Sequence, residues 1–285
     1  MGLGVYIVFM GLLFVAIVFF FIKHILAPRK LDYILNMIES GQYKKAITEA
    51  QLLIKKNERN HRAHFLLGEA LFGSKQMEEA MMEFKFLTKL NRYDDLVPEE
   101  SVRNRLAEIF LHFGQLEEAQ KEFLLMIKLN PANYEVLFKI AKLFWDRNYA
   151  ENAYTYFIKV LQINQKHAES HFYAGMILYE MKKETEAIVN LSSAIKYDPR
   201  LHKANYYLGL INMKNGSLHQ AVANFDDAQK DPEYRQKARL GKGQCYFELG
   251  DTNKAVVELE RGLKDITQED NISLAIRYTL GSCYE

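Results

Sequence analysis

One alanine recurs at a nearly constant interval along this chain. The interval is 34 residues in five cases and 39 residues in the sixth. The series consists of Ala46, Ala80, Ala119, Ala153, Ala187, Ala221 and Ala255. A period of this length is typical of a stacked array of one supersecondary unit, in which each unit buries its apolar face against its neighbours. The repeat therefore excludes most compact enzyme folds and predicts an extended surface for holding other molecules.

A second series of small residues runs in phase with the alanines. It consists of Gly68, Ala107, Ala141, Gly175, Gly209, Gly243 and Gly281. In the block 134–167, apolar residues follow helical spacing on both sides of a turn at Asn148. These two stripes are Leu137, Ile140, Ala141 and Phe144, and then Ala153, Phe157 and Val160. Each block is thus predicted to be a pair of antiparallel helices, whose backbones approach closely where the small residues meet.

The repeated pattern resembles the tetratricopeptide repeat family. That family places an aromatic residue, Leu-Gly and Tyr in its first helix, and Ala, Phe, Ala and a closing Pro around its second. The stretch 205–209 reads Asn-Tyr-Tyr-Leu-Gly and is followed by Ala221, Phe225 and Ala228. A second match consists of Leu106, Ala107, Phe110, Gly114, Ala119, Phe123 and Pro131. The first aromatic mark is replaced by His64, Leu137 and His171. The resemblance implies an all-α, right-handed solenoid that binds proteins.

The repeats are predicted to fill nearly all of the chain after residue 26. The expected units are 27–60, which is degenerate, then 61–94, 100–133, 134–167, 168–201, 202–235 and 236–269, and half a unit over 274–285. Insertions at 95–99 and 270–273 interrupt the phase and are expected to form longer loops, with Pro98 starting the next helix. Because natural arrays close with a polar capping helix, an array that stops mid-unit indicates a fragment of a longer protein.

The first 26 residues are expected to be a transmembrane anchor, with 3–22 in the bilayer. These twenty positions carry no charge, and fifteen of them are Leu, Ile, Val or Phe. Such a stretch is just long enough to span a bilayer core. It lacks the basic start and the small-residue cleavage site of a signal peptide. Lys23, Arg29 and Lys30 follow it, so the positive-inside rule favours a cytoplasmic array in a single-pass protein of the bacterial inner membrane, with a periplasmic array as the alternative.

The composition favours binding over catalysis. A formal net charge of +1 provides no field to gather nucleic acid, and Cys245 and Cys283 are too few for a disulfide framework. No metalloprotease, nucleophile-elbow or phosphate-loop motif occurs. His167 and His171 are spaced i, i+4, yet no third ligand accompanies them. We therefore expect no enzyme activity, no cofactor, no metal and no small-molecule substrate.

A row of large apolar residues is predicted to line the inner wall of the array. In the tetratricopeptide family the first helix of each unit lines this wall, and the positions about 100° from the packing stripe would face a partner. Aromatic residues and Met are enriched where proteins dock. The candidate groove residues are Phe65, Phe72, Leu111, Phe138, Trp145, Phe172, Tyr179, Tyr206, Met213, Phe247 and Tyr278. A partner helix or extended segment would fit such a groove, although some of these side chains could equally belong to the core.

These features together predict a membrane-tethered scaffold that recruits protein partners for assembly of a membrane-associated complex. An anchor followed by such repeats is similar to the bacterial lipopolysaccharide-assembly adaptors. It is also similar to the collar proteins of spirochaete flagellar motors, which would make the chain part of a larger envelope machine. The third alternative is the targeting part of an enzyme whose catalytic domain follows residue 285. A chaperone-tail clamp is not expected, because Lys203 and Lys237 are isolated basic residues on a mostly aromatic wall.

Overall fold

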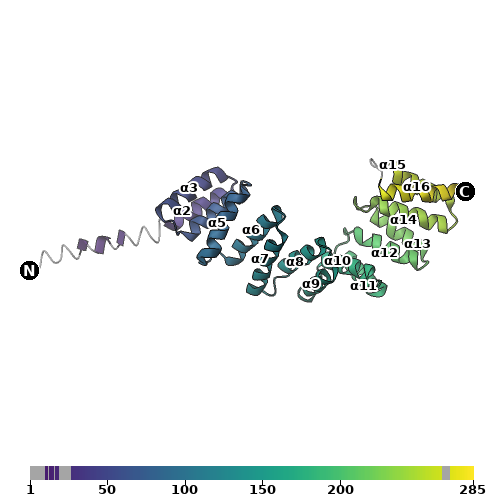
Figure 1. The fold of residues 1–285 in the computed structure, drawn as a ribbon, viewed down its shortest axis with the longest axis horizontal. Helices are drawn as coiled ribbons and strands as arrows, with labels where there is room; N and C mark the ends of the chain where they lie inside the picture. Colours follow the sequence, from purple (N-terminus) through teal and green to yellow (C-terminus); the bar gives the residue numbers. More distant parts are fainter. Residues whose placement is uncertain (1–9, 12, 16, 19–26, 265–269) are drawn as a thin grey trace, which may run out of the picture. The chain divides into compact units, whose positions relative to one another are not determined.

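The computed structural model describes residues 10–11, 13–15, 17–18, 27–264 and 270–285. All regular secondary structure in these residues is helical, as the sequence predicts (Figure 1). The chain divides into two compact units, Met1–Pro131 and Ala132–Glu285. In both, helices that are consecutive in sequence pack as antiparallel pairs, so the predicted helical hairpin is the element from which each unit is built.

The unit Met1–Pro131 contains six described helices after residue 26. They are α2 (Ala27–Glu39), α3 (Tyr43–Lys56), α4 (His61–Gly73), α5 (Met77–Leu90), α6 (Glu99–His112) and α7 (Leu116–Leu129). Helix α4 packs against α2, α3 and α5, and α6 packs against α5 and α7. The inserted segment between α5 and α6 contains Asn91 in the left-handed conformation and ends at Pro98, which is the N-cap of α6.

The unit Ala132–Glu285 continues the same pattern. It contains α8 (Tyr134–Asp146), α9 (Ala150–Ile163), α10 (Ala168–Glu180), α11 (Glu184–Tyr197), α12 (Lys203–Lys214), α13 (Leu218–Ala228), α14 (Arg235–Glu248), α15 (Thr252–Lys264) and α16 (Asn271–Tyr284). Asp270 caps α16 through a capping box with Ser273, so 270–273 is the start of a helix and not the longer loop that the sequence predicted.

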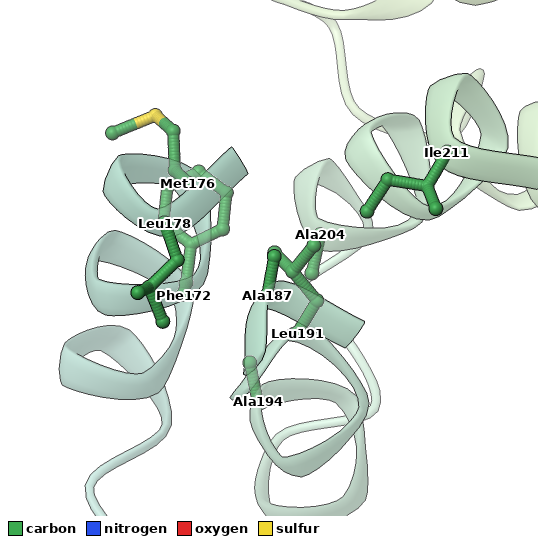
Figure 2. Close-up of a cluster of buried hydrophobic side chains, with 8 residues drawn as sticks. All are labelled: Phe172, Met176, Leu178, Ala187, Leu191, Ala194, Ala204 and Ile211. Atoms are coloured by element: carbon green, nitrogen blue, oxygen red, sulfur yellow. The ribbon is translucent and has the colours of Figure 1, made fainter. Parts of the chain in front are cut away.

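The small residues do sit where two helices touch. A Cβ atom added at Gly209 would lie 2.6 Å from the ring of Phe225, and one at Gly68 would lie 2.9 Å from the ring of Phe84. The alanines of the 34-residue series are fully buried. In Figure 2 Ala187 and Ala194 of α11 lie in a cluster with Phe172 of α10 and Ala204 of α12, and this cluster joins two consecutive hairpins. The core is therefore a series of such clusters along the array.

The expected membrane localisation is contradicted. The candidate segment 3–22 lies largely outside the described residues, and none of the helices in the part that the structure describes is long and apolar enough to cross a bilayer. The described helices have at most 14 residues, which corresponds to about 21 Å against a hydrocarbon core of about 30 Å. Helices at the surface of the array bury one face against their neighbours and expose the other to water, whereas α10 is buried over most of its surface because α9, α11 and α12 all pack against it.

Candidate protein-interaction surface

The first helices of consecutive hairpins lie against one another in the unit Ala132–Glu285. Helix α12 contacts both α10 and α14, and α14 contacts α16. Aromatic side chains from these helices and from α8 meet at their contacts. We call this set the aromatic row: Trp145, Phe172, Tyr173, Tyr179, Tyr206, Tyr207 and Tyr234. Edge-to-face and tilted arrangements of this kind are favourable beyond the area that they bury.

Ring contacts connect the aromatic row from one hairpin to the next. The ring of Tyr173 lies 6.2 Å from Trp145, and the ring of Phe172 lies 6.0 Å from Tyr207. Tyr207 also contacts Tyr179 at 5.6 Å and Tyr234 at 6.1 Å. Because each ring is held by its neighbours, the row is a continuous series of ring contacts with little side-chain freedom left to lose, in which Phe172 and Tyr234 are buried and the other rings are half-buried.

Three lysines lie along this surface. Lys142 Nζ donates to the Tyr173 hydroxyl at 2.9 Å and pairs with Asp146 at 3.4 Å. Lys203 Nζ lies 4.5 Å from the Phe172 ring centre, and Lys237 Nζ lies 5.0 Å from that of Tyr234. In the part of the chain that the structure describes, Lys203 and Lys237 contact aromatic rings and form no ion pair. These two ammonium groups are stabilised by aromatic faces and stay available to a carboxylate from a partner.

Three tyrosines of the aromatic row, Tyr206, Tyr207 and Tyr234, remain neutral phenols at physiological pH. Burial raises the pKa of Tyr207, and the neighbouring Tyr234, with which it shares a hydrogen bond, raises it further. Burial is also the main cause that raises the pKa of Tyr206 and of Tyr234. A neutral phenol presents both an apolar ring edge and a hydrogen-bonding hydroxyl, which suits a surface that contacts another protein.

The candidate groove residues differ widely in exposure. Phe172 and Phe65 belong to the core, with 2% and 8% of their surface exposed, whereas Tyr278 is 80% exposed. Leu111 and Phe247 are exposed at 36% and 39%. The half-buried members are Phe72, Phe138, Trp145, Tyr179, Tyr206 and Met213. Phe65 and Phe172 therefore belong to the core of their own units, and for the half-buried and exposed members contact with a partner stays a prediction.

Phe72 is covered by a charged side chain. The guanidinium of Arg105 lies 4.5 Å from the Phe72 ring centre and forms hydrogen bonds with Glu69 at 2.8 Å and Glu108 at 2.9 Å. Hydrogen bonding to Glu69 is the main cause that raises the pKa of Arg105, and it outweighs burial, which lowers that pKa. Helical periodicity placed Phe72 on the correct helix but gave no sign of this arginine, since the two residues belong to different hairpins.

Sequence reasoning missed Tyr173, Tyr207 and Tyr234. The first two directly follow predicted groove residues in the pairs Phe172-Tyr173 and Tyr206-Tyr207, and such tandem aromatics were the available signal. For metal chemistry the structure offers no support, since no group of three or more His, Cys, Asp or Glu is placed to hold an ion in the described ranges. His167 instead caps α10 by accepting from the Ser170 amide, and His171 contacts Asn190.

Comparisons with known proteins agree with this architecture. Family models described as tetratricopeptide repeat match residues 38–84, 101–133, 134–167 and 212–275. The chain is a tetratricopeptide repeat protein. Its fold is that of a protein-interaction scaffold, as the sequence predicted. None of the curated proteins matches it.

Solved structures resemble this tetratricopeptide repeat protein at low sequence identity. The C-terminal part of a repeat protein from Cytophaga hutchinsonii has a TM-score of 0.68 at 12% identity, covering 86% of this chain and 98% of its own. MamA from Desulfovibrio magneticus has a TM-score of 0.53 at 20% identity, covering 61% and 96%. YrrB, described as having an unusual peptide-binding site, has a TM-score of 0.53 at 15% identity, covering 61% and 88%. At these identities the likeness concerns the fold alone.

Proposed function

We propose that this tetratricopeptide repeat protein is a scaffold that recruits a partner by binding one of its helical or extended segments on the aromatic row, for assembly of a multiprotein complex. The supporting observation is the continuity of the row from α8 through α10 and α12 to Tyr234, the N-cap residue of α14, with rings fixed by one another. Preorganised aromatic side chains bind at low entropic cost. The peptide-binding site in the description of YrrB is consistent with this use of the fold.

The lysines define the chemistry of the partner segment. Lys203 and Lys237 lie on aromatic rings without a carboxylate partner among the described residues. A segment that combines apolar anchors with Asp or Glu side chains would pair with both ammonium groups and cover the rings between them. Such complementarity chiefly determines specificity and the association rate, so binding should weaken as the salt concentration rises.

Trp145 allows a direct test, because it is the only tryptophan of the chain. Peptides selected on the full chain from a displayed random library should change its intrinsic fluorescence when they bind. Replacing Trp145 and Tyr179 by Ala should weaken binding of the selected peptides more than about tenfold, measured by calorimetry. The matched control is Tyr149→Ala, which removes a 50% exposed aromatic ring at the N-cap position of α9, where it contacts Phe144, a residue outside the row.

A charge reversal tests whether the partner segment is acidic. The pair of substitutions Lys203→Glu and Lys237→Glu should deplete acidic sequences from the selected peptides. Lys182→Glu, on the turn after α10, should leave the selection unchanged. Selected peptides that bind the Trp145→Ala, Tyr179→Ala protein as tightly as the parent chain would contradict the proposed surface.

A further inference from the structure

Four hairpins contain a polar bridge at one repeat position. A residue in the first turn or two of the first helix forms a hydrogen bond with a residue 19 positions later in the second helix. The four pairs are His64–Glu83, Arg103–Glu122, His171–Asn190 and Asn205–Asn224. The aromatic mark of the family would occupy the first of these two positions. The bridges therefore replace an apolar contact by bonds whose strength depends on the chemistry of each pair.

The bridge between α4 and α5 requires an additional proton. His64 Nδ1 lies 2.5 Å from Glu83 Oε2, and His64 Nε2 lies 2.9 Å from the carbonyl oxygen of Glu58. A carbonyl oxygen and an ionised carboxylate only accept hydrogen bonds, and a neutral imidazole carries a single N–H. Both bonds can therefore be made at once only when the pair retains one proton more than neutral His64 and ionised Glu83 would hold.

The surroundings of His64 leave Glu83 as the group that controls this proton. Helix α5 also contributes the Phe86 ring, 4.2 Å from the imidazole centre. On α4 itself, His61 and Arg62 are bonded to Asp94. Among the described residues of α2 and α3, no charged group interacts with His64. Burial opposes the charged form of His64, but the hydrogen bonds to Glu83 and to the Glu58 carbonyl, with the Glu83 charge, raise its pKa above the ordinary value.

The other bridges do not share this requirement. Arg103 is a permanent cation, so its bond to Glu122 does not depend on physiological pH. His171 occupies the position of His64 and contacts the carbonyl oxygen of Gln165, yet its second partner is the Asn190 amide. Asn190 presents Oδ1 to His171 and donates Nδ2 to the Glu186 carbonyl oxygen. A half-turn of the amide, at the cost of the Glu186 bond, lets it donate to an unprotonated Nδ1 instead, so this bridge does not depend on a second imidazole proton. The α4–α5 hairpin thus differs from its counterparts in the protonation that its bridge demands.

We propose that the proton shared by His64 and Glu83 joins α4 to α5 and to the turn before α4, so that this hairpin loosens when the proton is lost as the pH rises. The direction of the pH dependence follows from the linkage between proton binding and folding stability. A histidine whose folded pKa is raised contributes its full stabilisation below the unfolded pKa of about 6.5, and this contribution is lost as the pH rises through the folded pKa. The loosening would affect α4 and α5, leaving α10 and α11 unchanged.

The direct test is an NMR titration of the histidine side chains in the full chain, with signals assigned from His64→Gln and His171→Gln. We expect His64 to titrate above pH 6.5, and Glu83→Gln to lower that midpoint by about one unit or more. Hydrogen exchange, corrected for the intrinsic rate at each pH, should show protection of α4 and α5 falling as the pH rises above about 6.5 in the parent chain and not in Glu83→Gln.

The His171–Asn190 bridge allows the converse substitution, in which a carboxylate is added instead of removed. Asn190→Glu places a carboxylate opposite His171 and should raise its titration midpoint by a similar amount. Glu79→Gln, an exposed change on α5, should alter neither midpoint. If Glu83→Gln does not fold, the parent titration and Asn190→Glu still decide the question. A His64 midpoint at or below 6.5, or protection of α4 and α5 that changes with pH equally in the parent and Glu83→Gln, would overturn the inference.

Discussion

At the scale of the residue, the turn between the two helices of each hairpin places one position in the left-handed region. Glycine occupies it at Gly41, Gly114, Gly216 and Gly250, with φ between 69° and 77°. Asn148 has φ 60°, and two lysines, Lys75 and Lys182, have φ 64° and 61°. A Cβ atom is unfavourable in this conformation, least so for Asn. The two lysines therefore store strain that glycine relieves in the other turns.

Replacing Lys182 by Gly should consequently stabilise the protein. The expected gain in the free energy of unfolding is about 1 kcal/mol, because relief of left-handed strain exceeds the added entropy of glycine in the unfolded chain. Denaturant unfolding measures it. The control is Lys182→Ala, which removes the same side chain while keeping a Cβ. An equal gain in both variants would assign the effect to the lysine side chain instead of the backbone.

A glycine inside a helix gives the opposite prediction. Gly209→Ala should lower the free energy of unfolding by about 1–3 kcal/mol, because the new Cβ would lie 2.6 Å from the Phe225 ring. Gly281→Ala is the matched change in α16, where nothing lies within 4 Å of the added atom. There the substitution should instead stabilise by about 0.5–1 kcal/mol. Thermal melts that show the same sign for both would contradict the close approach of α12 and α13.

At the scale of the element, the inserted segment between α5 and α6 is held by one carboxylate. Asp94 accepts from Arg62 Nε and His61 Nε2, both at 2.7 Å, and from the amides of Leu96 and Val97. Burial opposes the ionised form, but these hydrogen bonds lower the Asp94 pKa to about 2. An insertion that sequence analysis treats as a loop is thus ordered by contacts with the preceding hairpin.

Asp94→Asn should lower the free energy of unfolding by about 1–2 kcal/mol at neutral pH. Because the folded pKa is lowered, the contribution of Asp94 is present above about pH 3.8 and is lost as the pH falls towards 2. The stabilities of the parent and the variant should therefore converge in acid, as followed by urea unfolding at several pH values. Asp95→Asn, at an exposed neighbouring position, should change stability by less than about 0.5 kcal/mol.

At the scale of the whole molecule, each hairpin depends on its neighbours. The Phe225 ring illustrates this, since it lies against Gly209 of α12 and also against Gly241 of α14. One side chain thus joins two consecutive hairpins within the unit Ala132–Glu285. In an array with such nearest-neighbour contacts, damage should spread to adjacent repeats and fade with distance along the chain.

Phe225→Ala should lower stability by about 3–5 kcal/mol. Hydrogen exchange should increase across α12 to α15, whereas α4 and α5 should keep their protection. Val189→Ala, at a 61% exposed position on α11, serves as the control and should leave exchange unchanged. Uniform loss of protection over both units would show that the chain unfolds as one cooperative body, contrary to this expectation.

The sequence by itself determined the repeat, the helical hairpins and the places where helices touch. These properties depend on local spacing: the 34-residue period of small residues and the apolar stripes are visible without knowing any distant contact. It also located the helices that carry the aromatic row. It could not separate Phe172, which is buried, from Tyr278, which is exposed, because both occupy the same face of their helices.

Only the tertiary structure decided which side chains from different hairpins meet. Arg105 over Phe72, Lys142 on Tyr173 and Lys203 over Phe172 each join residues about 30 positions apart, and their contacts depend on how one hairpin packs on the next. None of the helices in the described ranges is long and apolar enough to cross a bilayer, whereas the apolar N-terminal composition had predicted a membrane protein. Spacing along the chain predicts which face of a helix is apolar, whereas the packing of one hairpin on the next decides which distant side chains that face meets.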